Sequence, residues 1–154
     1  MGQGVSVMTM TDRDQIQERM ARYANAIDAK DYGGIAACFL PGATVDYAGF
    51  TQPLQGIDPI ITHMRHSLEP LDAMQHIFGN FIIDIAGDAA RLTCDILAQH
   101  IRQGLQGGDS FMAGGKYDVR LRKVDGNWKF ETISARTVWG SGNRDLLPKA
   151  GDAG

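Results

Sequence analysis

The first part of the chain has the spacing of apolar residues that is typical of amphipathic helices. The first predicted helix covers residues 12–29, and the Thr11-x-x-Asp14 spacing just before and inside it is typical of a helix start. Its apolar side chains recur at steps of four, three and four: Ile16, Met20, Tyr23 and Ile27. Residues at these steps share one face of a helix, so we expect that face to be buried.

Two further helices and a strand are predicted before residue 70. Asp31 can cap a short second helix that runs to about Leu40. Residues 43–49 have the composition of a strand. Asp58 before a proline predicts the start of a third helix, which ends at Glu69. The apolar stripe of that third helix is Ile60, Ile61, Met64 and Leu68.

The second half of the chain changes to long strands separated by short turns. The predicted strands cover residues 74–85, 90–102, 111–124 and 128–139. Consecutive strands with short connections form an antiparallel meander, and helices from one end of the chain pack on one of its faces. Because long sheets twist, we predict an α+β fold in which a cone-shaped, curved antiparallel or mixed sheet wraps over the N-terminal helices. Its open end would leave a ligand cleft.

Length and composition agree with one globular domain. The chain has 154 residues, of which 44% are hydrophobic and 21% charged, and its net charge is -3. We place the domain at residues 11–140, after a flexible leader (1–10) and before a glycine-rich tail (141–154) in which only Leu146 and Leu147 could dock. A net charge of -3 does not indicate a basic surface of the kind that binds nucleic acid. No apolar run is long enough to span a membrane.

Two cysteines are too few for a disulfide framework. Cys38 and Cys94 each lie among apolar neighbours, so we expect buried free thiols. The N-terminus has no basic region followed by an apolar run, and therefore does not resemble a secretory signal. Together these features predict a cytoplasmic protein.

Strand alternation suggests which polar side chains point inward. In the strand over 74–85, one face carries Met74, His76, Phe78, Asn80 and Ile82, and the other carries Ile77, Phe81, Ile83 and Ile85. In the last strand, one face carries Trp128, Phe130, Thr132, Ser134, Arg136 and Val138. His76, Asn80 and Arg136 therefore interrupt apolar faces, and a buried charge such as Arg136 needs a partner, water or a ligand.

Asp28 is the second unusual polar residue, because it lies near the C-terminal end of the first helix. A carboxylate there faces the negative end of the helix dipole, which is unfavourable unless another group compensates. A histidine is a natural candidate for that partner, although Arg136 could also pair with Asp28.

Several candidate residues have ordinary structural explanations. A single histidine on an apolar face, such as His76, is more often a core residue with satisfied nitrogens, and Tyr23 could belong to the core alone. His63 and His66 lie beside or opposite the stripe of the third helix, which favours a solvated face. No third ligand accompanies them, so a metal site is not predicted. His100 is ambiguous, and Tyr47 could point either way.

Three short motifs in order resemble a known superfamily. They are A-I-D-A-K-D at the end of the first helix, Q-H-x-x-x-N at the start of the first long strand, and D-G-x-W-K-F in the last hairpin. Together, over residues 11–140, they resemble the nuclear transport factor 2-like superfamily. More narrowly they are similar to its SnoaL-like branch, which includes scytalone dehydratase, bile acid 7-alpha dehydratase and hexachlorocyclohexane dehydrochlorinase. The resemblance implies the same cone-shaped α+β barrel.

The resemblance also implies roles for particular residues. In lyases of this branch an aspartate orients a histidine that abstracts a proton, and Asp28 and His76 occupy the matching places. Tyr47 resembles a tyrosine that holds the leaving-group water, and Arg136 resembles an arginine of the last strand. We expect these four residues to be catalytic. We expect the substrate to be contacted by Tyr23, Phe78, Asn80 and Phe130.

The leading hypothesis is therefore a cofactor-independent lyase, of dehydratase or dehydrohalogenase type, that acts on a hydrophobic cyclic small molecule. Histidine suits a base near neutral pH, and a buried carboxylate can fix its tautomer. The alternatives are a polyketide cyclase or ketosteroid isomerase-like enzyme, and a non-catalytic binding or assembly module. No metal or other cofactor, nucleic acid or membrane is expected as a partner. The resemblance implies a homo-oligomer, either trimer or dimer.

Overall fold

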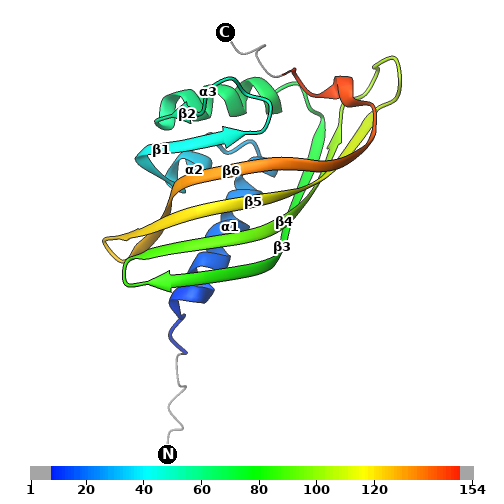
Figure 1. The fold of residues 1–154 in the computed structure, drawn as a ribbon. Helices are drawn as coiled ribbons and strands as arrows, with labels where there is room; N and C mark the ends of the chain where they lie inside the picture. The colour runs from blue at the N-terminus through cyan, green and yellow to red at the C-terminus, as the bar shows by residue number, and fades with distance from the viewer. Residues whose placement is uncertain (1–7, 150–154) are drawn as a thin grey trace, which may run out of the picture.

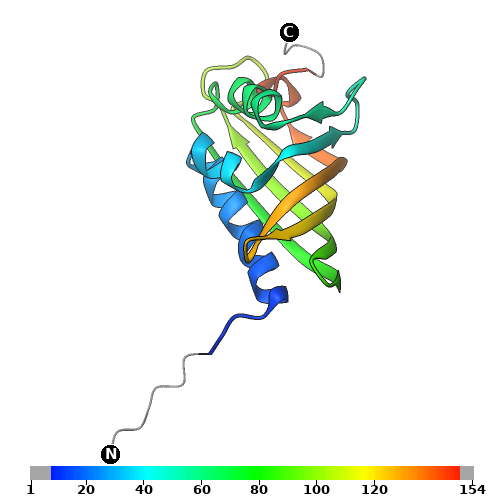
Figure 2. The same cartoon turned by 90° about the vertical axis from the view of Figure 1, so that its left-hand side faces the viewer.

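The computed structural model describes residues 8–149, which form helices packed against one curved sheet (Figures 1 and 2). The helices are α1 (Asp12–Asp28), α2 (Tyr32–Ala37), α3 (Ile57–Leu68) and the short 3-10 helix η1 (Arg144–Leu146). The strands are β1 (Phe39–Tyr47), β2 (Leu54–Gln55), β3 (Ala73–Ala86), β4 (Ala89–Ile101), β5 (Ser110–Val124) and β6 (Asn127–Gly142). The predicted leader and tail fall partly outside the described residues.

The sheet has six strands in the order β2-β1-β6-β5-β4-β3. Strands β3 to β6 form the predicted antiparallel meander. Strand β1 joins β6 in parallel and pairs on its other side with β2, a short strand that the sequence pattern did not indicate. The sheet is therefore mixed and open, and Figure 2 shows it curving around α1. The predicted fold class is confirmed.

Helix α1 has the N-terminal cap and the buried apolar face that its sequence predicted. The backbone N–H of Asp14 donates to the Thr11 hydroxyl, and the Asp14 carboxylate accepts from the Thr11 backbone, which completes a capping box. The apolar stripe is buried against the concave face of the sheet: Ile16, Met20, Tyr23 and Ile27. The helix ends at Asp28, one residue before the predicted end.

Two predicted boundaries are wrong because tertiary packing overrides local pattern. Helix α2 ends at Ala37, and the chain is already extended at Phe39. Phe39 is buried edge-on against the rings of Tyr23 and Phe130, at centroid distances of 5.7 and 5.3 Å. Helix α3 begins at Ile57, with Gly56 as its N-cap, so Asp58 lies inside the first turn and does not cap it.

A bulge in β3 changes which side chains face the core. The pairing of β3 with β4 shifts between Gly79 and Ile82, where Asn80 has a φ of 54°. Beyond the shift Ile83 is buried, whereas Ile82 is 65% exposed. The predicted faces are therefore wrong after Gly79: Asn80 and Ile82 lie on the convex face, and Phe81 packs against the core.

A second bulge has the same effect in β6. The pairing of β5 with β6 shifts between Phe130 and Thr132, so one residue is inserted in β6. Ile133 and Ala135 are buried beyond it, while Arg136 is exposed. The prediction that Arg136 points into the concave wall is therefore wrong, because strict alternation holds only where no residue is inserted.

The convex face carries exposed apolar side chains. Ile77, Leu97 and Trp139 are 55%, 46% and 46% exposed, and the pairing places them in one row across β3, β4 and β6. Such a row is compatible with self-association, and the expected homo-oligomer stays a prediction. Within residues 8–149 no helix is both long and apolar enough to cross a membrane.

At Gly115, in the middle of β5, the neighbouring strand leaves no room for a side chain. A Cβ at Gly115 would collide with the main-chain carbonyl oxygen of Arg136 on β6, which only a backbone shift can relieve. We expect Gly115→Ala to lower the free energy of unfolding by about 1–3 kcal/mol, measured by urea denaturation. Gly79→Ala is the matched control, since a Cβ at Gly79 would meet nothing within 4 Å. Equal stabilities of the two variants would contradict this packing.

Candidate functional site

The C-terminal end of α1 meets the start of β3 through Asp28 and His76. The carboxylate Oδ1 of Asp28 lies 2.7 Å from Nδ1 of the His76 ring. The backbone N–H of His76 also donates to both carboxylate oxygens, at 3.1 Å each. The Asp28 and His76 side chains are 23% and 10% exposed. These donors compensate the carboxylate for its unfavourable place at the end of the helix dipole.

This contact determines how the imidazole of His76 is presented. An ionised carboxylate can only accept hydrogen bonds, so Nδ1 must carry the proton that it shares with Asp28. In a neutral ring the other nitrogen, Nε2, is then a bare acceptor. His76 lines a cavity on the concave side of the sheet. With Asp28 ionised, the contact therefore leaves Nε2 as the ring nitrogen that can accept a hydrogen bond or a proton.

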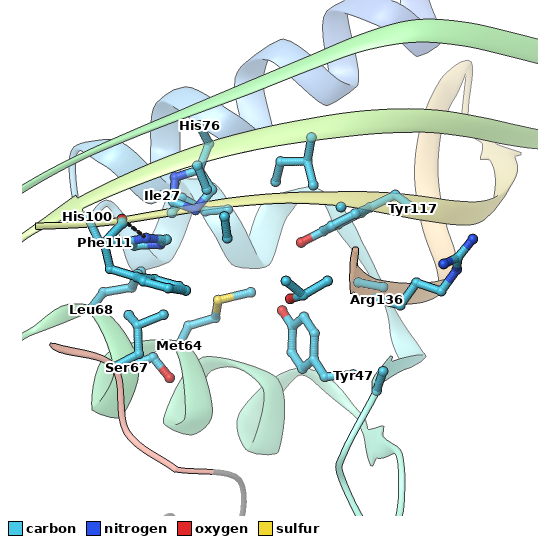
Figure 3. Close-up of a pocket in the computed structure, with 18 of the residues that line it drawn as sticks. Ile27, Tyr47, Met64, Ser67, Leu68, His76, His100, Phe111, Tyr117 and Arg136 are labelled. Atoms are coloured by element: carbon cyan, nitrogen blue, oxygen red, sulfur yellow. Dashed lines mark hydrogen bonds between the residues drawn. The ribbon is translucent and has the colours of Figure 1, made fainter. Parts of the chain in front are cut away.

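The cavity lies between α3 and the concave face of the sheet (Figure 3). Its volume is about 260 Å³, close to the lower end of the ~300–1,000 Å³ usual for small-molecule sites. Its apolar walls come from helices and strands far apart in the sequence: Ile27, Met64, Leu68, Ile96, Ala98 and Phe111. The remaining wall residues include several histidines and tyrosines, which make the cavity suited to a mainly apolar ligand with a few polar groups.

His100 is the second histidine beside His76. Its ring lies edge-on to that of His76 at a centroid distance of 5.5 Å, and its Nδ1 lies 3.2 Å from the carbonyl oxygen of Phe111. His100 is 7% exposed. Burial, and then the neighbouring His76, lower the pKa of His100 to about 4. His100 is therefore a neutral member of the cavity wall near pH 7, which resolves its ambiguity in the sequence.

Tyr23, Tyr47 and Tyr117 bring three phenols to the same cavity. Figure 3 shows the hydroxyl ends of Tyr47 and Tyr117 pointing into it. Burial raises the pKa of Tyr47 to about 12 and the pKa values of Tyr23 and Tyr117 well above the usual range, so all three stay protonated. The buried Tyr23 hydroxyl makes no hydrogen bond of good geometry within residues 8–149, although it lies close enough to the Tyr47 phenol for each to affect the pKa of the other. Protonated phenols of this kind can donate to an oxygen of a ligand.

The structure brings only part of the predicted site together. The cavity is lined by three of the predicted residues, His76, Tyr23 and Tyr47. Asp28 contacts the His76 ring without lining the cavity itself. Phe78 lies behind it, stacked on Tyr23 at 6.2 Å. Phe130 is fully buried against the other side of Tyr23, at 5.2 Å, and supports the cavity wall without lining it.

Two predicted residues are displaced from the site by the bulges. Asn80 lies on the convex face, where its side-chain amide donates to Asp95 at 2.7 Å. Arg136 borders the cavity, but its side chain is exposed and Figure 3 shows the guanidinium pointing away from the tyrosines. Asn80 is therefore outside the cavity, and Arg136 lies at its border with its charged group turned outward.

Sequence reasoning missed several residues that line the cavity. Tyr117 shares the inward face of β5 with Phe111, and the alternation of that strand could have identified it. His63 and Ser67 line the cavity from α3, on a face that the apolar stripe alone does not include. Arg144 of η1 lies with its guanidinium 5.3 Å from the Phe111 ring, and no local pattern in the tail indicates this position.

Residues 8–149 contain neither a candidate metal-binding cluster nor an activated cysteine. No three His, Cys, Asp or Glu side chains in this range lie together as candidate metal ligands. Cys38 and Cys94 are buried free thiols, as predicted. Burial raises the pKa of the Cys38 thiol, and it raises the pKa of Cys94 to about 12. Neither thiol is therefore activated as a nucleophile.

Comparison with known proteins assigns the family. The model of the SnoaL-like domain matches residues 8–134. The chain belongs to the SnoaL-like domain family. A relative, terrestric acid biosynthesis cluster protein E of Penicillium crustosum, is 29% identical over 146 residues, which cover 91% of this chain and 92% of the relative. That relative is therefore similar in length as well as in sequence.

Solved structures with lower identity share the fold. A scytalone dehydratase-like protein from Novosphingobium aromaticivorans DSM 12444 superposes with a TM-score of 0.80 at 22% identity, covering 92% of this chain and 93% of its own. The type 3 LinA hexachlorocyclohexane dehydrochlorinase from Novosphingobium barchaimii LL02 gives 0.74 at 16% identity, covering 86% and 90%. The SnoaL-like assignment suggested by the sequence motifs is confirmed.

The buried, neutral His100 should make the fold sensitive to acid. Because the pKa of His100 falls from 6.5 to about 4 on folding, the unfolded chain binds a proton between these values and the folded chain does not. Lowering the pH from 8 to 5 should therefore reduce the free energy of unfolding through this residue by about 1–2 kcal/mol. Urea titrations at several pH values should show a shallower acid slope for His100→Phe. The same slope in both proteins would contradict the burial of a neutral ring.

Proposed function

We propose that the protein is a cofactor-independent lyase that eliminates water or a halide from a hydrophobic, cyclic small molecule, with Asp28 and His76 as its catalytic pair. The observation that carries the proposal is the 2.7 Å contact between Asp28 and His76 at the wall of an apolar cavity. Membership of the SnoaL-like family and the fold shared with dehydratase-like and dehydrochlorinase structures support it.

In this proposal Nε2 of His76 takes a proton from a substrate carbon. The electron pair of the broken C–H bond forms a C=C bond, and the bond from the neighbouring carbon to the leaving group breaks. Asp28 stabilises the imidazolium that forms, because it already holds Nδ1–H. Histidine suits this step as a residue type, because an ordinary imidazole exchanges a proton readily near neutral pH.

The leaving group would depart toward the tyrosines. A halide can leave as an anion and needs only hydrogen bonds, whereas hydroxide must gain a proton to leave as water. Tyr47 can supply either the hydrogen bond for a halide or the proton for hydroxide, because its phenol stays protonated at neutral pH. Tyr117 lines the same cavity and is a second donor, while the exposed side chain of Arg136 is poorly placed for this role. When the leaving group is hydroxide, Tyr47 gives it a proton as the C–O bond breaks, so water leaves and Tyr47 becomes a phenolate. The proton that His76 took from carbon then passes through solvent to this phenolate, which restores both residues and makes the net reaction loss of one water. When the leaving group is a halide, Tyr47 keeps its proton and His76 releases its own to solvent.

The polar character of the cavity favours an enzyme over a non-catalytic module. A binding or assembly module could fill this space with large apolar side chains, yet histidine and tyrosine side chains line it. A polyketide cyclase or isomerase would use the same base to move a proton without losing a leaving group. Release of the leaving group and exchange of the substrate proton, measured on the same compound, separate these three functions. A lyase releases the leaving group, a cyclase or isomerase moves the proton alone, and a binding module does neither.

We expect the wild-type protein to convert members of a panel of cyclic β-hydroxy ketones and cyclic halides into conjugated products, followed by absorbance in D₂O. His76→Gln and Asp28→Asn should each lower kcat by about 10²–10⁴-fold, because the base or its orienting carboxylate is lost. Asn80→Gly, on the convex face and at a position of positive φ that glycine adopts freely, is the control and should keep the wild-type rate.

Deuterium exchange at the substrate carbon without loss of the leaving group would favour the cyclase or isomerase alternative. Elimination at unchanged rate in both the His76 and the Asp28 variants would contradict the proposed pair.

A further inference from the structure

Helix α3 presents a polar pair to the cavity beside its apolar stripe. Ile60, Met64 and Leu68 are buried, and His63 and Ser67, four residues apart, lie next to them on the same side of the helix. Both are half-buried and both line the cavity. His66, by contrast, is exposed. The expectation that His63 lies on a solvated face is therefore wrong, and the proposed elimination leaves this pair without a role.

The His63 ring is held in place from several sides. Its Nε2 lies 3.4 Å from the Ser67 hydroxyl, a long contact that leaves both groups able to bind another partner. The rings of Tyr47 and Phe50 pack against it at centroid distances of 5.3 and 4.9 Å. No hydrogen bond to Nδ1 of His63 is found among residues 8–149. The pair is thus an ordered polar group with unused hydrogen-bonding capacity.

The charge state of the pair indicates what it can bind. Burial, and then the neighbouring His66, lower the pKa of His63, so its ring is neutral near pH 7. A neutral imidazole offers one donor and one acceptor, and a serine hydroxyl offers both. This set matches a hydroxyl or carbonyl oxygen. It offers no fixed positive charge for a carboxylate or phosphate.

The position of the pair indicates where on the ligand that oxygen would be. His76 projects from β3 on the sheet side of the cavity, whereas Ser67 projects from α3 on the opposite side (Figure 3). Apolar side chains, among them Met64 and Ile96, line the space between. A ligand that reaches both walls would have an apolar body with polar groups at two separate places.

From these contacts we propose that His63 and Ser67 form a second polar subsite, which binds a hydroxyl or carbonyl oxygen of a cyclic ligand away from the carbon that faces His76. The proposal rests on the cavity being the ligand site, as in the proposed function, but does not depend on elimination taking place. It narrows the ligand class to cyclic molecules that carry an oxygen substituent away from the reacting carbon.

Two probes separate this subsite from the rest of the cavity: 2-naphthol, with one hydroxyl, and 2,7-dihydroxynaphthalene, with a second hydroxyl on the far ring. Isothermal titration calorimetry gives the Kd of each. The wild type should bind the diol about 3- to 10-fold more tightly, as expected for one additional net hydrogen bond. His63→Leu should abolish this preference, and Ser67→Ala should reduce it. His66→Leu, on the exposed side of α3, is the matched control and should keep it.

The ratio of the two dissociation constants is the readout, because a merely structural role of His63 would weaken both probes equally. His63→Gln, which retains a side-chain donor and acceptor, should keep part of the preference and covers the case in which His63→Leu fails to fold. His76→Gln should also keep the preference, even if it has lost all lyase activity, so failure of the proposed function would be visible separately. An unchanged ratio in His63→Leu, or no binding of either naphthol to the wild type, would overturn the proposal.

Discussion

The contact between Asp28 and His76 links the two parts of the molecule on which the cavity depends. Strand β3 is at the edge of the sheet, so its outer backbone groups have no neighbouring strand. The Asp28 carboxylate accepts from the His76 backbone N–H there and from the His76 ring. At the other end of α1, the Arg13 guanidinium donates to the carbonyl oxygen of Ile83 at 2.8 Å. Helix α1 is therefore attached to β3 near both of its ends, which fixes the ring of His76 relative to the helix.

The cavity follows from this attachment and from the segments that close it. Helix α1 covers the lower part of the concave face, and α3 and the C-terminal segment lie over the rest (Figures 1 and 2). Leu146 of η1 is buried, and Leu147 and Pro148 line the cavity. Asn143 holds the preceding loop through its amide, which donates to the carbonyl oxygens of Gln106 and Gly108. Part of the glycine-rich tail is thus a wall of the site.

The sequence predicted what depends on helical periodicity and on local chemistry. Helix α1, its capping box and the four-strand meander followed from the spacing of residues. The cost of a carboxylate at a helix C-terminus indicated only that Asp28 needs a partner, and the resemblance to the SnoaL-like branch pointed to His76 as that partner. The predicted inward and outward faces of β3 and β6 were wrong beyond the point where a bulge inserts one extra residue in each strand. The pair Gly79-Asn80 inside a strand is a signal in the sequence that suits a bulge, and Asn80 does adopt a positive φ there. No residue around Glu131 gives such a signal for the second bulge. Strict alternation therefore puts Arg136 on the wrong face.

The proposed chemistry depends on Asp28 fixing the tautomer of His76, so that Nε2 faces the cavity as a base. Long-range ¹H–¹⁵N NMR correlation of the His76 ring tests it most directly, in the wild type and in Asp28→Asn. We expect the wild-type ring to be a single tautomer with the proton on Nδ1 and none on Nε2. In Asp28→Asn we expect a mixture of tautomers or the reverse tautomer. A wild-type ring protonated on Nε2, or a tautomer unchanged by loss of the carboxylate, would contradict it.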